Sequence, residues 1–159
     1  MKWFFVLFAL PVVLLAGALF LNRPPMLAPP GPTERLRTYL ATNVAETREG
    51  HDFSELQPPL FAADAEKTQD AVVAAMRSLG WREIQVIQEE VRAVVVSAFF
   101  RFRDDVTVRT EATEKGTLLH ARSASRVGKG DLAANARHLA VLFARVEHLI
   151  AEEDAHSAP

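Results

Sequence analysis

An uninterrupted apolar segment near the N-terminus constrains this chain more than any other feature. The run from Trp3 to Leu21 reads WFFVLFALPVVLLAGALFL and contains no charged side chain. As a helix at about 1.5 Å per residue it is roughly 28 Å long, close to the hydrocarbon thickness of a bilayer. It has no polar stripe, so in water it would expose apolar surface on every side. We therefore expect a transmembrane helix.

Three alternatives remain open for this segment. The first is an uncleaved signal anchor over residues 1–21, and the second is a secretory signal peptide with Lys2 as its basic region and Ala16-Gly17-Ala18 as its cleavage site. The third is a helix buried in a protein core. We favour the anchor, because the run exceeds the usual apolar core of a signal peptide, about 7–15 residues.

The anchor predicts a location for the rest of the chain. With so short a leader, an N-terminal anchor usually inserts like a signal sequence and translocates the domain that follows. We therefore expect a single-pass protein of the bacterial cytoplasmic membrane with a periplasmic or otherwise extracytoplasmic domain. The basic residues Arg23, Arg35 and Arg37 after the run favour the opposite topology, so orientation is only weakly encoded.

Composition excludes several classes of protein. The 18 basic and 20 acidic residues give a net charge of -2, whereas a general nucleic-acid binder needs a basic excess. No cysteine is present, so disulfides, thiolate metal sites and cysteine nucleophiles are excluded. The hydrophobic fraction of 49% and charged fraction of 24% are typical of a folded domain.

The chain divides into an anchor, a linker and one domain. Residues 22–32, NRPPMLAPPGP, are rich in proline, which predicts a semi-rigid linker that lifts the domain off the bilayer. Residues 33–152 form the predicted domain, and residues 153–159 a flexible tail.

Hydrophobic periodicity predicts the fold of this domain. Helical spacing is found over residues 33–45, 65–79 and 131–152, with Asp64 as an N-cap and Gly80 as a left-handed stop. Segments rich in Val, Phe, Thr and Ile, with short turns between them, predict strands over residues 81–88, 92–102, 104–112 and 117–125. We expect an α+β fold in two layers, with a four-stranded antiparallel meander packed against the helices.

Polar residues gather on this predicted sheet and on the loop after it. Because side chains alternate along strands, one sheet face is expected to hold Arg101, Asp105, Arg109, His120, Arg122 and Arg126. Two glycines, Gly128 and Gly130, then lead to Asp131, which can cap the last helix, and Asn135 follows one turn later.

Two of these segments resemble a known family. The runs RFRDDV, from Arg101 to Val106, and RSASRVGKGDLAANARHL, from Arg122 to Leu139, are similar to the signature of the bacterial and plastid family called domain of unknown function 1499. The resemblance covers roughly residues 55–150, and it implies the domain but no activity. The matching residues are Arg101, Phe102, Asp104, Asp105, Arg122, Ser123, Ser125, Arg126, Gly128, Asp131 and Asn135. The chain departs at Ala133, where the family tends to have glycine, and at His138, where it tends to have arginine.

The candidate site is the polar cluster of these matching residues. Its members are Arg101, Asp104, Asp105, Arg122, Ser123, Ser125, Arg126, Gly128, Asp131 and Asn135. It can be a structural network that fixes strand register, or a site for an anion such as a phosphate, a lipid headgroup or an envelope glycan. Asp131 weighs against an anion, because its own carboxylate fills the helix N-terminus.

Other functions are less favoured by the sequence. A hydrolase would use the Asp, Ser and His side chains of the cluster, but no nucleophile elbow or phosphate loop is present. The histidines lack metal-ligand spacing, so we expect no catalytic residue, metal or cofactor. The remaining alternative is an adaptor that binds an envelope protein. We therefore expect a membrane-anchored envelope protein with a non-catalytic binding or accessory module.

Overall fold

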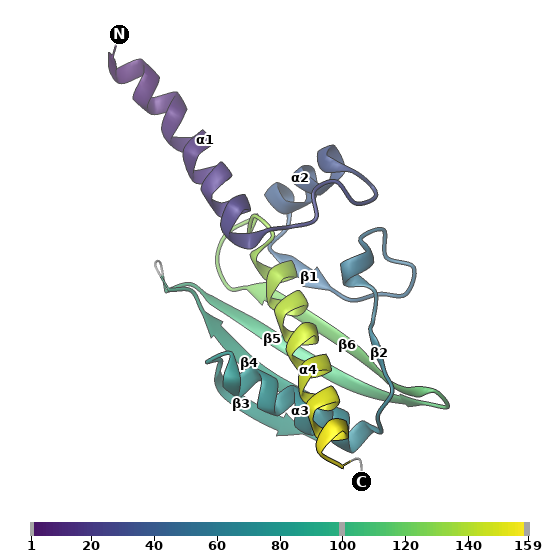
Figure 1. The fold of residues 1–159 in the computed structure, drawn as a ribbon. Helices are drawn as coiled ribbons and strands as arrows, with labels where there is room; N and C mark the ends of the chain where they lie inside the picture. The colour runs from purple at the N-terminus through teal and green to yellow at the C-terminus, as the bar shows by residue number, and fades with distance from the viewer. Residues whose placement is uncertain (1, 99–100, 158–159) are drawn as a thin grey trace.

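The computed structural model describes residues 2–98 and 101–157. An antiparallel sheet forms one layer, and two long helices cover one of its faces, so the predicted α+β fold is confirmed (Figure 1). The helices are α1 (Lys2–Asn22), α2 (Pro32–Ala41), α3 (Ala65–Ser78) and α4 (Ala134–Ser157), with a single 3-10 turn η1 (Ser54–Leu56). Helices α3 and α4 lie on the sheet, whereas α1 projects away from it.

The sheet contains the predicted meander and two further short strands. Its strands are β1 (Val44–Glu46), β2 (Leu60–Phe61), β3 (Arg82–Ile87), β4 (Glu90–Val96), β5 (Arg103–Thr113) and β6 (Gly116–Ser125). The order is β1-β6-β5-β4-β3, and β2 also pairs with β6. The helix expected over residues 33–45 ends at Ala41, and residues 44–45 belong to β1 instead. Strands of two or three residues, such as β1 and β2, are too short to show a period of two in the sequence.

Buried and exposed side chains alternate along β5 and β6, and the buried ones form the sheet side of the core. Val106 and Val108 on β5, and Leu119 and Ala121 on β6, are at most 3% exposed and face the helices. Val108 pairs with Ala121, so the two apolar sets lie side by side. At the hairpin Gly116 has φ 132°, and a Cβ there would lie 2.1 Å from the Phe61 carbonyl oxygen. Only glycine therefore lets β2 approach this edge of the sheet.

The helices that cover the sheet are placed by their caps and apolar stripes. The Asp64 carboxylate accepts a hydrogen bond of 2.8 Å from the Lys67 amide, which confirms the predicted N-cap of α3. Val72 and Met76 on α3, and Leu139 on α4, are fully buried. Helix α4 continues through residues 153–157, which the sequence analysis assigned to a flexible tail; residues 158–159 of that tail lie outside the described residues.

The predicted transmembrane helix is corrected by the structure. Among the residues that the structure describes, no helix combines the length and the apolar character that crossing a membrane requires. The last turn of α1 instead belongs to the domain: Leu19 packs against the core, and Asn22 Nδ2 donates a hydrogen bond of 2.8 Å to the Leu132 carbonyl oxygen. The apolar run alone gives no sign of these contacts, because residues 110 positions apart leave no local pattern in the sequence.

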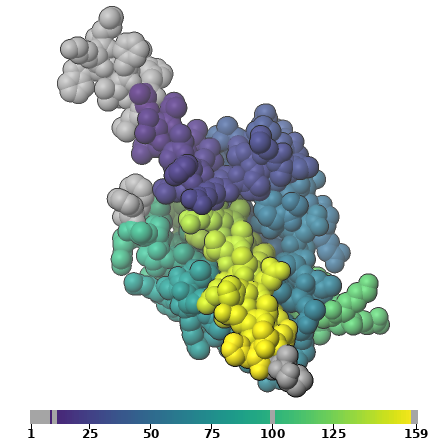
Figure 2. Space-filling model, in the orientation of Figure 1, coloured from purple at the N-terminus to yellow at the C-terminus, as the bar shows by residue number. Residues whose placement is uncertain are grey.

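Further toward its start, α1 leaves the body of the domain. In Figure 2 its described part emerges beside the N-terminal end of α4 and extends away from the sheet. Among the α1 side chains that the structure describes, Val12, Val13, Leu14, Phe20 and Leu21 are 60–73% accessible to solvent.

The segment expected to be a linker makes several contacts with the domain. Met26 packs against the core, and the Arg35 side chain donates hydrogen bonds to the carbonyl oxygens of Ala28, at 3.0 Å, and Pro29, at 2.7 Å. The chain between α1 and α2 is therefore held on the domain surface by side chains of the domain itself.

Candidate functional site

The predicted site residues are divided between two layers of the fold. Asp104 and Asp105 are neighbours on β5, so the first faces the helices and the second faces the outer surface of the sheet. Arg122 lies on the outer face of β6, whereas Ser123 and Ser125 lie on the helix-facing side. The predicted cluster is therefore two networks rather than one site.

The outer network consists of ion pairs. The Arg126 guanidinium donates two hydrogen bonds to the Asp105 carboxylate, at 2.9 and 2.7 Å, and lowers the pKa of that carboxyl group. Arg122 lies 3.8 Å from Glu46. The same face carries the further pairs Arg92–Glu90, Arg103–Glu83 and Arg109–Glu111. An anion on this face would have to compete with a carboxylate already bound to each of these arginines.

Arg101 does not join this face. The predicted strand 92–102 ends at Val96, and Arg101 lies in the loop to β5 with φ 56°. The part of that prediction at residues 99–100 lies outside the described residues.

The inner network is centred on Asn135, which is fully buried. Its Oδ1 accepts a hydrogen bond from Ser123 Oγ at 2.5 Å, and its Nδ2 donates to the Asn43 carbonyl oxygen at 2.8 Å and to Ser125 Oγ at 2.9 Å. These bonds join the chain before β1, the end of β6 and the first turn of α4. Asn135 is thus a structural lock whose polar atoms all have protein partners.

The loop before α4 is held by the chain between α2 and β1. Asn43 Nδ2 donates a hydrogen bond of 2.7 Å to the Gly128 carbonyl oxygen, and a Cβ at Gly130 would lie 2.4 Å from the Leu40 carbonyl oxygen. The Asp131 carboxylate accepts from the amides of Ala133, at 3.0 Å, and Asn135, at 2.9 Å, as a cap at this end of the helix should. Burial raises the pKa of Asp131, and these hydrogen bonds oppose the rise.

His138 lies beside this lock and contacts Asp104. Its Nδ1 is 3.7 Å from Asp104 Oδ2 and 3.4 Å from Ser123 Oγ. A nucleophile relay needs the two nitrogens of the ring to contact different partners, whereas both contacts here involve Nδ1. Ser123 is also fully buried. These three residues therefore lack the arrangement of a hydrolase.

Burial lowers the pKa of His138, and the Asp104 carboxylate opposes that shift. Asp104 Oδ1 is buried and has no hydrogen-bond partner among the described atoms. The arginine expected at position 138 from the family resemblance would present two parallel donors to this carboxylate, whereas His138 reaches only Oδ2. Nor does any group of three or more His, Asp or Glu side chains within the described ranges come close enough to hold a metal ion.

Ala133 is the other position at which the chain departs from the family pattern. It has φ 69°, in the left-handed region that favours glycine, and its side chain is 1% exposed. The backbone of this loop therefore has the shape that a glycine would adopt without strain.

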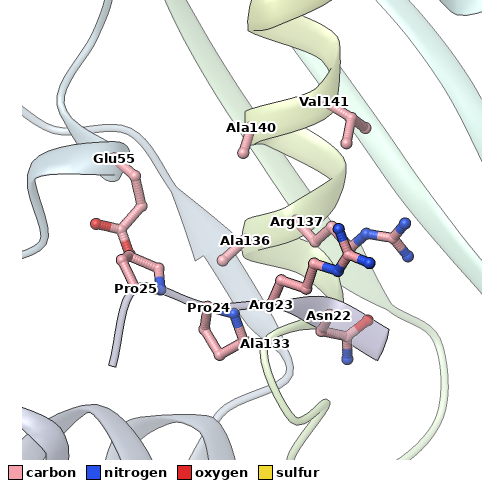
Figure 3. Close-up of a pocket in the computed structure, with 10 residues that line it drawn as sticks. All are labelled: Asn22, Arg23, Pro24, Pro25, Glu55, Ala133, Ala136, Arg137, Ala140 and Val141. Carbon is pink, nitrogen blue, oxygen red and sulfur yellow. The ribbon is translucent and has the colours of Figure 1, made fainter. Parts of the chain in front are cut away.

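A largely apolar pocket lies against the N-terminal half of α4, close to these residues. It is a pocket of about 440 Å³, here called the α1–α4 pocket, lined by Asn22, Arg23, Pro24, Pro25, Glu55, Ala133, Ala136, Arg137, Ala140 and Val141. Figure 3 shows Glu55 at one side and the guanidinium groups of Arg23 and Arg137 at the other, with α4 alanines between them. Among the described residues, neither of these two guanidinium groups has a carboxylate or hydrogen-bond partner.

Glu55, by contrast, is fully engaged. The Arg35 side chain is completely buried and holds the two oxygens of Glu55 at 2.5 and 3.1 Å. Arg35 also donates to the Tyr39 hydroxyl at 3.0 Å and stacks over the Phe53 ring, 4.3 Å from its centroid. With the bonds to Ala28 and Pro29 described above, every N–H group of this guanidinium has an acceptor.

Sequence reasoning missed the α1–α4 pocket and the Arg35–Glu55 pair. Arg137 was only one of several charged residues on the polar side of a predicted helix, and Arg23 was one residue of a presumed spacer. No local signal distinguishes a buried arginine such as Arg35 from an exposed one such as Arg37. The pocket is built from segments that the chain brings together only after folding.

The comparisons with known proteins identify the family. The fold and the two polar networks define an α+β domain with one helix-covered sheet face. The family model "Protein of unknown function (DUF1499)" matches residues 34–146, more than half of the chain, and the chain belongs to this family. The resemblance noted from the sequence is thereby confirmed. No curated protein matches the chain.

Proposed function

We propose that this protein is a non-catalytic binding module and that its ligand is a small anion held in the α1–α4 pocket. The observation that carries the proposal is the pair Arg23 and Arg137. These two guanidinium groups line one concave site and have no carboxylate partner among the described residues. A pocket of about 440 Å³ is within the range that small-molecule ligands occupy, roughly 300–1,000 Å³.

A comparison with the outer sheet face supports this assignment. On the outer sheet face, Arg92, Arg103 and Arg126 each have a carboxylate partner, so their charge is already balanced. At the α1–α4 pocket the one carboxylate, Glu55, is bound by the buried Arg35. The two pocket arginines therefore carry positive charge that a bound anion would balance.

The chemistry of guanidinium narrows the ligand class. Its planar, forked donors match the oxygens of a carboxylate or a phosphate, and each such charge-assisted hydrogen bond is stronger than a neutral one. Both arginines are exposed, which leaves their donors available. The anion expected from the sequence is thus retained, but its proposed site moves from the sheet to the α1–α4 pocket.

Calorimetric titration of the full-length chain with butyl phosphate tests this function. We expect binding to the unmodified chain and an affinity about tenfold to a hundredfold lower in Arg137→Gln, from a charged hydrogen bond of roughly 1.5–3 kcal/mol. Arg23→Gln should weaken binding in the same direction. Arg77→Gln removes the same charge from an exposed position on α3 outside the pocket and is the matched control. Equal affinities in Arg137→Gln and Arg77→Gln would refute the assignment.

A second candidate function, binding of a protein partner, is favoured by the exposed side of α1. Phe20 is 73% exposed and Leu14 60%, and they are two of the five large apolar side chains that the described part of α1 exposes. Several exposed apolar side chains on one element are typical of an interaction surface. Photo-crosslinking from position 14 should then yield a product of one defined mass, whereas position 82 on β3 should not. Identical products from both positions would argue against a specific partner.

A further inference from the structure

We infer that the ligand of the α1–α4 pocket is amphiphilic, with its phosphate or carboxylate head at Arg23 and Arg137 and an apolar part along α4 toward Glu55. This inference rests on the proposed function, because it takes the same pocket as the binding site. It adds the shape of the ligand and the direction in which it lies.

The wall of the pocket between its two ends is apolar and made of small side chains. Helix α4 contributes Ala136, Ala140 and Val141, which share one side of the helix, and the chain after α1 contributes Pro24 and Pro25. Alanine methyl groups leave room that a larger side chain would fill. Contact between this apolar surface and an alkyl or aryl group of a ligand removes both from water, which favours binding.

The far end of the pocket cannot take a second charged group. Both oxygens of Glu55 are bound by Arg35, so its charge is already neutralised within the protein. A ligand with an ammonium group at that end would gain little from Glu55, and a second anionic group would approach its carboxylate. The end of the ligand that lies near Glu55 is therefore uncharged (Figure 3).

The polar and apolar parts of the pocket lie in a fixed order along α4. Arg137 is on the same helix as Ala140 and one turn before Val141. Asn22, which adjoins Arg23, is held to the Leu132 carbonyl oxygen by its hydrogen bond of 2.8 Å. The two arginines are thus attached to a rigid helix and to a pinned helix end, which places the head of the ligand and directs its chain along the alanines.

A series of alkyl phosphates tests this inference on the full-length chain. Ethyl, butyl and hexyl phosphate carry the same head on chains of increasing length. Burial of one methylene is worth roughly 0.8 kcal/mol, so affinity should rise about fourfold for each added methylene until the pocket is full. Hexanoate, with the same number of carbon atoms as hexyl phosphate, distinguishes a carboxylate head from a phosphate head.

A variant that fills the apolar wall provides the structural control. Ala140→Trp should abolish the gain in affinity with chain length while ethyl phosphate still binds. Ala144→Trp, one turn further along the exposed side of α4 and outside the pocket, should keep the gain. Circular dichroism of both variants checks that α4 remains folded.

The outcomes separate this inference from the proposed function. If the alkyl phosphates bind with equal affinity and Arg137→Gln weakens all of them, the anion site stands and the amphiphilic ligand is overturned. If no member of the series binds, both proposals fail. If the affinity of Ala140→Trp still rises with the length of the alkyl chain, the chain binds outside the α4 wall of the pocket. That result would also overturn the inference.

Discussion

Arg35 and Arg137 lie near the same pocket and show two opposite uses of arginine. Arg35 is fully buried, pairs with Glu55 and has an acceptor for each donor. Arg137 is exposed and has no partner among the described side chains. A buried charge is tolerated only when it is paired and hydrogen-bonded, whereas an exposed charge can remain without a partner at little cost. The first arginine therefore maintains the fold, and the second is free to bind a ligand.

The largest expected effect is the loss of the buried arginine. Arg35→Met leaves the Glu55 carboxylate without its partner, and the free energy of unfolding should fall by about 3–5 kcal/mol. Chemical denaturation measures this change. Arg37→Met, on the same helix with a side chain 79% exposed, is the matched control and should change stability little. Similar losses in the two variants would contradict the role given to Arg35.

The next largest effect concerns the buried Asn135 lock. Asn135→Leu has a similar size but leaves Ser123 Oγ and the Asn43 carbonyl oxygen without their present partner. Each buried polar group left unsatisfied costs roughly 1–3 kcal/mol. Because Ser123 Oγ keeps its contact with His138 Nδ1 at 3.4 Å, we expect a loss of about 2–4 kcal/mol in the same denaturation experiment. A variant as stable as the unmodified chain would show that other groups satisfy these atoms.

His138 should make stability depend on pH. Burial lowers its pKa in the folded state below its ordinary value of 6.5, so only the unfolded chain takes up the proton just below that pH. This contribution to stability is fully present above pH 6.5 and is lost as the pH falls through the lowered pKa. Melting temperatures from pH 7.5 to 5 should therefore fall less in His138→Gln than in the unmodified chain. His148→Gln, at an exposed position on the same helix, is the control, and parallel curves for all three proteins would contradict this account.

The smallest expected effect is at the outer sheet face. Arg126→Gln removes the two hydrogen bonds to Asp105, but this pair is solvated, and surface ion pairs contribute little to stability. The melting temperature near pH 7 should hardly change. Because Arg126 holds the pKa of Asp105 low, its contribution is present above the ordinary value of 3.8 and is lost as the pH falls below it. A large loss at neutral pH would show that the outer network is part of the structural lock.

The sequence predicted the elements that carry a strong local period and missed the contacts that join them. The alternation of β5 and β6 placed Asp105, Arg109, His120 and Arg122 on one face, and the structure agrees. The cap at Asp64 and the meander were also predicted correctly. Arg101 was misplaced because the strand before it ends at Val96, where the apolar pattern alone gives no stop signal.

The candidate site was less predictable than the fold, for a physical reason. Glu55 is 20 positions from Arg35, and Leu132 is 110 positions from Asn22, so neither contact has a periodic signature. The apolar run of α1 similarly indicated lipid, because hydropathy counts side chains and does not see that Leu19 and Asn22 contact the domain. Only the folded arrangement shows which arginines lack a partner.

The sharpest test of the α1–α4 pocket as an anion site is the affinity of the full-length chain for hexyl phosphate, measured in Arg137→Gln and in Arg77→Gln. We expect the unpartnered arginine of the α1–α4 pocket to bind the phosphate group. Arg137→Gln should therefore bind at least about tenfold more weakly than Arg77→Gln, a difference of roughly 1.4 kcal/mol. Equal affinities in the two variants would contradict the claim.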